Sequence, residues 1–292
     1  MTTTHKIGRF FQHIGYQIHR GTLPLRRSGF STFDEERILN HYITEFFGAG
    51  HRGTAVDIGA GDGRTGSNTL ALFKNGWKGI GIEGDDRKAA KLATLYRQFP
   101  NVEARRFRVT PDNVLALLEG HGVETNFSLL SIDIDSYDYL VLDAILSRYR
   151  PGIVISEINE KIPPPIKFSV NYDPDFQLRE HFYGYSIAYL EELCGKHDYA
   201  VIDLEYNNVF LAPREIAGGR ALTVEEAYRR GYADRPDRHK KFHRNENMEF
   251  LQSASPEEGI RFIRQFFAQF NGKYELSVAS GGGEGASMNR ES

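Results

Sequence analysis

The chain has 292 residues, of which 40% are hydrophobic and 26% are charged, and this composition is typical of a folded protein with one substantial core rather than a disordered chain. Its formal net charge of -3 at pH 7 gives no overall attraction to phosphate backbones, so no nucleic-acid partner is expected. The single cysteine, Cys194, excludes an internal disulfide, and because the sequence shows neither a secretory segment nor a transmembrane-length apolar run, the expected compartment is the cytoplasm.

Residues 1–50 are predicted to form accessory helices. Apolar side chains recur there at helical spacing, and the segment is basic, with no acidic residue before Asp34. We expect its first helix to cover the functional site or pack on the core; the alternative is a basic amphipathic helix that lies on a membrane surface. The apolar positions are Ile7, Phe10, Phe11, Ile14 and Ile18, and the basic ones are Lys6, Arg9, His13, Arg20, Arg26 and Arg27. A second helix over residues 33–47 is expected to end at Gly48 and Gly50.

Residues 54–211 alternate short apolar runs with amphipathic ones, which predicts an α/β fold with a doubly wound, mostly parallel sheet. Strands are expected over residues 55–58, 79–83, 102–106, 129–133 and 153–157, with helices over 87–98 and 138–149 between them. Four of these strands are continuously hydrophobic, as buried parallel strands are, and the run 102–106 is typical of an edge strand.

The second half of the chain adds an insertion, a hairpin and an extension. Residues 158–184 contain three consecutive prolines and several aromatic residues, which favours a functional loop over disorder. A helix over 186–196 and a hairpin of strands 200–205 and 209–212 follow. The core domain thus covers 51–215, and 216–279 is expected to be a helical extension in which Ser255, Pro256 and Glu258 start a helix through a capping box. The polar, glycine-rich tail 280–292 is expected to be disordered.

The segment 56–63 carries the strongest functional signal. An apolar strand ends at Asp57 and is followed by Gly59, Gly61 and Gly63 at alternating positions. Glycine removes the Cβ that would block a close ligand and tolerates the φ values of a tight turn, and the next helix is expected to present free N–H groups there. The turn therefore predicts a ligand held against the backbone.

Glu83, at the end of the next strand, adds a second element to this site. An acidic residue in that position accepts hydrogen bonds from the two ribose hydroxyls of a nucleoside. Asp57 stands at the strand end, where it can accept hydrogen bonds from an ammonium group, which a dinucleotide lacks. Together they favour a nucleoside cofactor with an amino-acid arm over NAD.

With these motifs, residues 55–212 resemble the class I S-adenosylmethionine-dependent methyltransferases. The resemblance implies their Rossmann-like fold, with a reversed terminal strand formed by the hairpin, and transfer of a methyl group to an acceptor. It also implies that Asp57, Gly59, Gly61 and Gly63 hold the methionine moiety, that Glu83 holds the ribose and that Asp112 contacts the adenine amino group. A helix cap before Val114 is the alternative for Asp112.

Residues 129–139, 162–173 and 181–184 are similar to the methyltransferases of the FkbM-like kind. That narrower resemblance implies O-methylation of a glycan or natural-product hydroxyl, so the expected partner is a small-molecule acceptor. The basic residues Arg235, Arg238, His239, Lys240, Lys241, His243 and Arg244 form either a solvated face or a contact for an anionic acceptor such as a nucleotide sugar.

Polar residues at two further strand ends are the candidates for catalysis. Asp133 and Asp135 follow the fourth strand, and Glu157 and Asn159 follow the fifth, so the carboxyl ends of neighbouring strands bring them to one crevice. Asp133 is the candidate general base, and Asp133, Glu157 and Asn159 are alternatively the oxygen ligands of Mg²⁺. Capping of the helix near Tyr139 by Asp135 or Asp138 is the structural alternative.

His181 lies in the aromatic insertion and is a second catalytic candidate, either as a base or as a group that orients the acceptor. The alternative is a hydrogen-bonded loop residue. Two other functions share the glycine-rich turn and the acidic residue: an NAD-dependent oxidoreductase and a catalytically silent cofactor-binding scaffold.

Overall fold

The computed structural model describes residues 29–279. The expected amphipathic helix around Ile7–Ile18 and the expected disordered tail 280–292 lie outside the described residues. Within 29–279, no helix combines the length and apolar character that crossing a bilayer requires.

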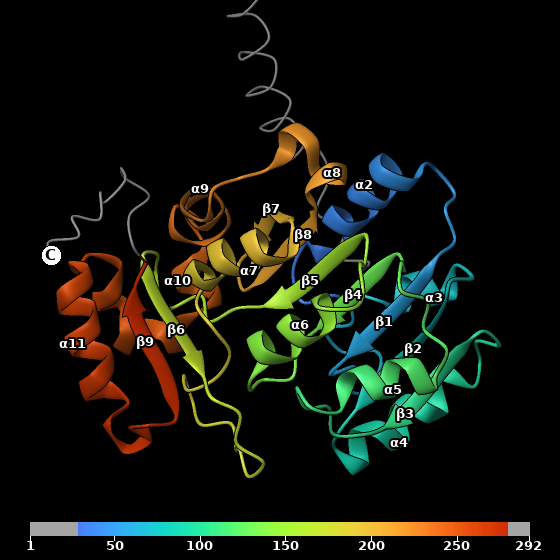
Figure 1. Ribbon diagram of the computed structural model, residues 1–292, viewed down its shortest axis with the longest axis horizontal. Helices are drawn as coiled ribbons and strands as arrows, with labels where there is room; N and C mark the ends of the chain where they lie inside the picture. Colours follow the sequence, from blue (N-terminus) through green and yellow to red (C-terminus); the bar gives the residue numbers. More distant parts are fainter. Residues whose placement is uncertain (1–28, 280–292) are drawn as a thin grey trace, which may run out of the picture.

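A seven-stranded sheet forms the centre of the molecule (Figure 1). Its strands in chain order are β1 (Thr54–Ile58), β2 (Lys78–Glu83), β3 (Val102–Arg106), β4 (Leu129–Ile132), β5 (Ile153–Glu157), β7 (Tyr199–Glu205) and β8 (Asn208–Pro213). Their spatial order is β3-β2-β1-β4-β5-β8-β7. The first five strands are parallel, and β8 is antiparallel to both β5 and β7. The predicted fold class is therefore confirmed, including the reversed strand.

Burial explains why the five parallel strands are recognisable in the sequence. β1, β2, β4 and β5 are almost wholly buried because helices cover both faces of the sheet, whereas β3 lies at the edge and is half exposed, as predicted. The hairpin also agrees with prediction, although its turn is tighter. Tyr206, with a positive φ of 56°, and Asn207 alone connect β7 to β8.

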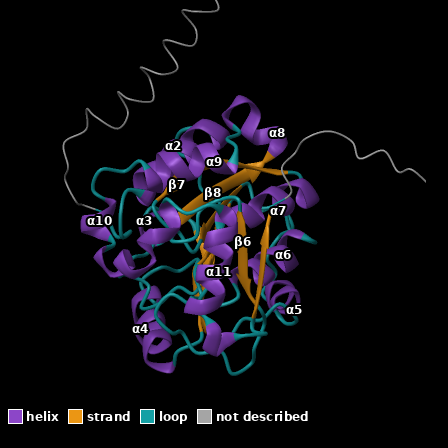
Figure 2. Ribbon diagram, turned by 90° about the vertical axis from the view of Figure 1, so that its left-hand side faces the viewer, coloured by secondary structure: helices purple, strands orange, loops and turns teal. Residues whose placement is uncertain are grey.

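Helices pack on the two faces of the sheet (Figures 1 and 2). The helices are α2 (Glu35–Phe47), α3 (Leu70–Lys74), α4 (Asp86–Tyr96), α5 (Val114–Gly120), α6 (Asp138–Leu146), α7 (Leu190–His197), α8 (Arg214–Ala217), α9 (Val224–Tyr228), α10 (Arg238–Lys241) and α11 (Pro256–Phe266). α2, α3 and α4 share one apolar cluster with the sheet, and α5, α6 and α7 share the other. The predicted helix over 33–47 is confirmed, and Gly48 ends it with a φ of 91°.

The insertion and the C-terminal extension form a second unit beside the main sheet (Figure 1). β6 (Ile166–Val170) pairs antiparallel with β9 (Tyr274–Val278), so each segment contains a strand that the sequence analysis does not anticipate. Phe168, Phe182, Phe267 and Tyr274 stack against one another between them. The expected start of α11 is confirmed, because Ser255 and Glu258 form the capping box. The domain boundaries themselves remain predictions.

Candidate functional site

A cleft of about 690 Å³ opens at the carboxyl ends of β1, β2 and β4. This is the topological switch point of the sheet, since β1 is followed along the chain by β2 on one side while β4 lies on its other side. Crevices at such points are the usual ligand sites of open α/β sheets. Residues lining the cleft include Gly59, Gly61, Thr65, Glu83, Lys88, Arg108, Asp133, Asp135, Ser136 and Tyr137.

The three glycines of the turn after β1 serve different purposes. A Cβ on Gly59 would lie 1.7 Å from the carbonyl oxygen of Asp133, so glycine allows the turn to approach the end of β4. Gly61 has a φ of 58° and open space around its Cβ position at the cleft, whereas a Cβ on Gly63 would collide with Leu92 and Tyr96 behind the turn. Gly59 therefore lets the turn pack against β4 at the cleft, Gly61 leaves backbone accessible to a ligand, and Gly63 allows packing behind the turn.

No helix begins directly after this turn, contrary to expectation. α3 starts at Leu70, so the chain from Gly59 to Thr69 is a loop. Within it, Asp62 accepts hydrogen bonds from the N–H groups of Arg64 and Thr65. The turn is consequently organised by side chains and not by the N-terminus of a helix.

Glu83 lies in the cleft and holds its two flanking loops together. One carboxylate oxygen accepts a 2.8 Å hydrogen bond from the Gly61 N–H, and the other accepts a 2.7 Å bond from the Asp85 N–H. Each carboxylate oxygen can accept a second bond, so the group remains available to hydroxyls in the cleft. Glu83 stands where the sequence analysis expects an acidic residue.

Asp57, in contrast, lies behind the turn. Its side chain is 5% exposed and accepts a 2.6 Å hydrogen bond from the Thr69 hydroxyl, and it is not among the lining residues of the cleft. Burial raises the pKa of the Asp57 carboxyl to about 6, and hydrogen bonds from Thr69 and Ser131 oppose that rise. The expected contact of Asp57 with an ammonium group stays a prediction. Asp57 connects the end of β1 to the start of α3.

Asp112 is exposed in the turn before α5 and is also absent from the cleft lining. The turn is held by its neighbour Asn113, whose side chain accepts a hydrogen bond from the Thr110 N–H and donates one to the Arg108 carbonyl. The cleft wall in this region contains Phe107 and Arg108, which the sequence analysis does not single out. Phe107 is 40% exposed beside the cleft, and only the tertiary structure shows this exposure.

Three carboxyl groups meet at the ends of β4 and β5. Asp133, Asp135 and Glu157 each offer an oxygen within 4.8 Å of the other two. Burial raises the pKa of Asp133 to about 8, and the nearby charges of Asp135 and Asp138 add to the shift. The pKa of Glu157 is raised well above its usual range for the same reason, with Asp133 the largest charge contribution. The cluster therefore needs protons or a cation to compensate its negative charge.

Asp138 is the first residue of α6 and does not cap it, contrary to the structural alternative, because the N-cap of this helix is Tyr137 and has no side-chain cap hydrogen bond. The buried carboxylate of Asp138 accepts hydrogen bonds from the N–H groups of Ile134 (2.8 Å) and Ser136 (3.0 Å), which fixes the loop between β4 and α6. Asp135 lies in this loop with a φ of 54° and lines the cleft. The loop thus presents Asp133 and Asp135 to the cleft and keeps Asp138 inside the protein.

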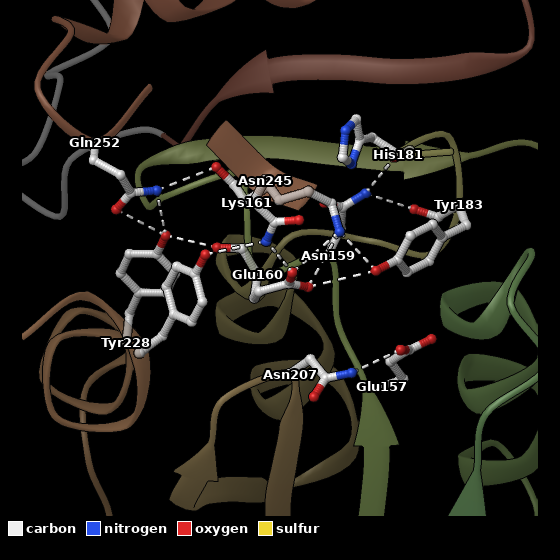
Figure 3. Close-up of polar contacts among 11 residues, drawn as sticks. Glu157, Asn159, Glu160, Lys161, His181, Tyr183, Asn207, Tyr228, Asn245 and Gln252 are labelled. Carbon is white, nitrogen blue, oxygen red and sulfur yellow. Dashed lines mark hydrogen bonds and ion pairs between the residues drawn. The ribbon is translucent and has the colours of Figure 1, made fainter. Parts of the chain in front are cut away.

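Glu157 and Asn159 differ in their contacts (Figure 3). One oxygen of Glu157 accepts a 2.8 Å hydrogen bond from Asn207, while Oε2 is buried without a partner among residues 29–279. The Asn159 amide donates to the carbonyls of His181 and Tyr183, both at 2.9 Å, so it holds the insertion in place. The acidic cluster therefore contains Asp135 where the predicted ligand set has Asn159.

His181 does not face the carboxylate cluster. It lines a second, polar cavity of about 790 Å³ together with Glu160, Lys161, Glu180, Tyr183, residues 241–245 and Asn247. Its ring forms a hydrogen bond with Asn247, and burial lowers the pKa of the imidazole. The structure thus places the two catalytic candidates, Asp133 and His181, in neighbouring but different hollows.

A buried ion pair forms one wall of the polar cavity (Figure 3). Lys161 and Glu160 are 3% and 1% exposed, and their charged atoms lie 3.2 Å apart. Lys161 also donates a 2.6 Å hydrogen bond to the Tyr183 hydroxyl, and Asn245 donates one of 2.6 Å to Glu160. The insertion and the C-terminal extension are thereby joined around one cavity. Sequence reasoning missed this cluster, because its members come from three distant segments.

No family model and no curated protein matches the chain. Among solved structures, it is similar to a SAM-dependent methyltransferase from Aquifex aeolicus, with 14% identity over 64% of this chain and 94% of that one, and a TM-score of 0.39. It is similar to a S-adenosylmethionine-dependent methyltransferase from Clostridium acetobutylicum, with 11% identity over 70% and 97% of the two chains and a TM-score of 0.39. A putative O-methyltransferase from Klebsiella pneumoniae has 16% identity over 69% and 88%, with a TM-score of 0.42. At these values the assignment of the site rests on the geometry of the cleft.

Proposed function

We propose that this protein is an S-adenosylmethionine-dependent methyltransferase that methylates a hydroxyl group of a small-molecule or glycan acceptor. The observation that carries the proposal is the cleft at the switch point of the sheet, where Gly61 exposes backbone and Glu83 presents a carboxylate. Such a crevice suits a nucleoside whose ribose hydroxyls donate to Glu83. The antiparallel β8 supports a methyltransferase over a nicotinamide-binding domain, and the resemblance of residues 129–139 and 181–184 to FkbM-like enzymes motivates the proposed class of acceptor.

When bound, the cofactor supplies a sulfonium-activated methyl group, whose S–CH₃ bond breaks with its electrons left on sulfur as the O–CH₃ bond forms. Gly59 and Gly61 admit the methionine part, and Glu83 fixes the ribose. Asp57 acts through Thr69 by holding the loop that follows the turn. Most of the rate enhancement then comes from aligning the acceptor oxygen and excluding water.

The carboxylate cluster is proposed to handle the acceptor hydroxyl. Asp133 lines the cleft at the end of β4, next to the strand that carries the glycine turn. Its ionised form takes up the hydroxyl proton, and the raised pKa of about 8 means that this form predominates only in alkaline solution. His181 is proposed to orient the acceptor from the polar cavity, because it is separated from the cleft lining.

As the alternative to this acid–base role of Asp133, we propose that Asp133, Asp135 and Glu157 form a site for a divalent cation such as Mg²⁺. Carboxylate oxygens are the ligands that this ion prefers, and the buried, unpartnered Oε2 of Glu157 fits such a role. Bound there, the ion would lower the pKa of the acceptor hydroxyl and orient it. Calorimetric titration of the protein with Mg²⁺ and Mn²⁺ tests this: we expect binding that Asp135→Asn abolishes and Asp112→Asn leaves unchanged. Equal binding by both variants, or none by the wild type, would refute the site.

Isothermal titration with S-adenosylhomocysteine tests the cofactor assignment. We expect Glu83→Ala to weaken binding by at least about tenfold, because a charged acceptor of two hydroxyls is lost. Glu103→Ala is the matched control, since Glu103 lies on the adjacent edge strand and outside the cleft lining. Normal affinity of Asp112→Ala for S-adenosylhomocysteine would show that Asp112 does not contact the adenine.

The same experiment separates the alternative functions. Binding of NAD without binding of S-adenosylhomocysteine would replace the methyltransferase with an oxidoreductase. Asp133→Asn should keep cofactor affinity and lose turnover by about 100-fold or more, the usual contribution of a positioned acid–base group. Normal cofactor binding without methyl transfer to any acceptor in wild-type protein would favour the silent scaffold.

A further inference from the structure

The polar cavity lies directly beyond the carboxylate cluster along the sheet. The glycine turn follows β1, Asp133 follows β4 and Glu157 ends β5, and neighbouring strands are about 4.8 Å apart. Glu160, three residues after the end of β5, already lines the polar cavity. The cofactor cleft, the carboxylates and the cavity therefore follow one another along the carboxyl edge of the sheet.

The cleft and the cavity share a wall. Tyr183 lines the cavity, and the N–H of the next residue, Gly184, donates a 2.7 Å hydrogen bond to the carbonyl of Ser136, which lines the cleft. Lys161, on the cavity side, also acts electrostatically on Asp135 in the cleft. A molecule in the cavity is thus adjacent to the groups proposed to act on the acceptor hydroxyl.

The turn after α10 presents basic side chains to this cavity. Phe242 packs against Phe33 and Tyr206, with ring centroids 5.5 Å away in both cases, and Asn245 is buried and bonded to Glu160. These two anchors fix the positions of His243 and Arg244 between them. Both lie in the cavity lining, and neither side chain has a hydrogen bond or an ion pair with any residue from 29 to 279.

Two acidic side chains also line the cavity, Glu160 and Glu180, and they differ in how far they offset the positive charge of the basic side chains. Glu160 is neutralised by Lys161 and accepts further bonds from Asn245 and Tyr183. Glu180 is exposed and lines the same cavity as Arg244. The remaining free groups at the cavity are mostly hydrogen-bond donors, which suit a ligand rich in acceptors and negative charge.

We propose that this cavity binds an anionic group, a phosphate or a carboxylate, of the methyl acceptor through Arg244 and His243. Its identification as the acceptor rests on the proposed function. Arg244 and His243 attract such a group, so the anion lies at the Arg244 end and the hydroxyl to be methylated points towards Asp133. The basic segment after residue 234 is thus divided: Arg235 pairs with Glu205 and Arg238 with Glu249, while Arg244 faces the ligand.

Calorimetry with four probes at constant ionic strength tests the proposal: inorganic phosphate, glucose 1-phosphate, glucuronate and neutral methyl glucoside. We expect the anionic sugars to bind more tightly than the neutral one, and the preference between phosphate and carboxylate identifies the anion. Arg244→Ala should weaken anion binding by about tenfold. Glu180→Gln should strengthen anion binding by about threefold, because it removes a negative charge that repels the anion. Lys240→Ala should change the affinity for the anion by less than about twofold. All three positions are exposed, so the variants should fold.

Equal affinity for neutral and anionic probes, unchanged binding in Arg244→Ala, or no binding of any anionic probe would overturn the inference. Titration with S-adenosylhomocysteine in the same variants distinguishes the two proposals. Arg244-dependent anion binding in a protein that does not bind S-adenosylhomocysteine would leave the anion site standing and refute the methyltransferase. Normal binding of S-adenosylhomocysteine without anion binding would leave the methyltransferase proposal standing and refute the anion site.

Discussion

Replacing Asp57 with asparagine should make the protein more stable at neutral and alkaline pH. The Asp57 carboxyl is 5% exposed, and burial raises its pKa from the usual 3.8 to about 6. Ionisation of this group in the folded protein therefore costs roughly 3 kcal/mol more than in the unfolded chain. Asparagine has nearly the same shape, carries no charge and can still accept the hydrogen bond from Thr69.

The sign of the pH dependence follows from the raised pKa. Because the folded protein binds this proton more tightly than the unfolded chain, folding favours the protonated carboxyl. The free energy of unfolding contributed by Asp57 is therefore greatest below about pH 4 and falls as the pH rises towards the folded-state pKa of about 6. The two proteins should be equally stable near pH 4, and Asp57→Asn should be more stable by up to roughly 3 kcal/mol above pH 7.

Urea denaturation followed by tryptophan fluorescence measures this difference. Trp77 is the only tryptophan of the chain and is 2% exposed, so its emission reports loss of the core. Asp62→Asn provides a control of opposite sign, since the N–H of Thr65 lowers the pKa of Asp62 and its carboxylate stabilises the fold above the usual pKa. A stability difference for Asp57→Asn that does not vary with pH, or a less stable variant at pH 8, would refute the reasoning.

Two further expectations concern close packing and buried charge. Gly59→Ala should lower the free energy of unfolding by more than about 3 kcal/mol, because its Cβ would overlap the backbone of Asp133. Gly61 also has a positive φ, but the space around its Cβ position is open, so Gly61→Ala should lower the free energy of unfolding by only about 1 kcal/mol. Equal losses in urea denaturation would contradict this steric explanation. Lys161→Met should cost about 3–5 kcal/mol by leaving Glu160 buried without its cation, and the double variant with Glu160→Gln should recover most of that loss. A double variant less stable than Lys161→Met would show that the ion pair is not the source of the effect.

Much of the main sheet is predictable because its strands have a local signature. β1, β4 and β5 are buried on both faces, so nearly every position must be apolar, and the exposed edge strand β3 is recognisable by its charged residues. β6 and β9 lack such a signature. They pair across more than 100 residues of chain, and their pairing depends on contacts between Phe168, Phe267 and Tyr274 that no local pattern contains.

For the candidate site, the sequence predicts which residues lie at the carboxyl ends of the strands, but not which of their side chains face the cleft. Parallel strands bring their carboxyl ends to one edge, and the sequence analysis accordingly places Gly61, Glu83 and Asp133 at one crevice. Whether a side chain at a strand end faces the crevice depends on the following loop. That loop turns Asp135 into the cleft and Asp138 away from it, and the helix after β1 begins too late to contribute.

Sequence alone determined the α/β architecture, the reversed strand and the glycine turn with its acidic partner, because alternation of apolar runs and glycine positions are local properties of the chain. Only the tertiary structure decided that Asp57 is buried behind the turn, that Asp135 completes the carboxylate cluster, and that Lys161 and Arg244 share a cavity with His181. Burial and electrostatic environment arise from segments distant in sequence. They exist only once the two sheets and the C-terminal extension have packed together.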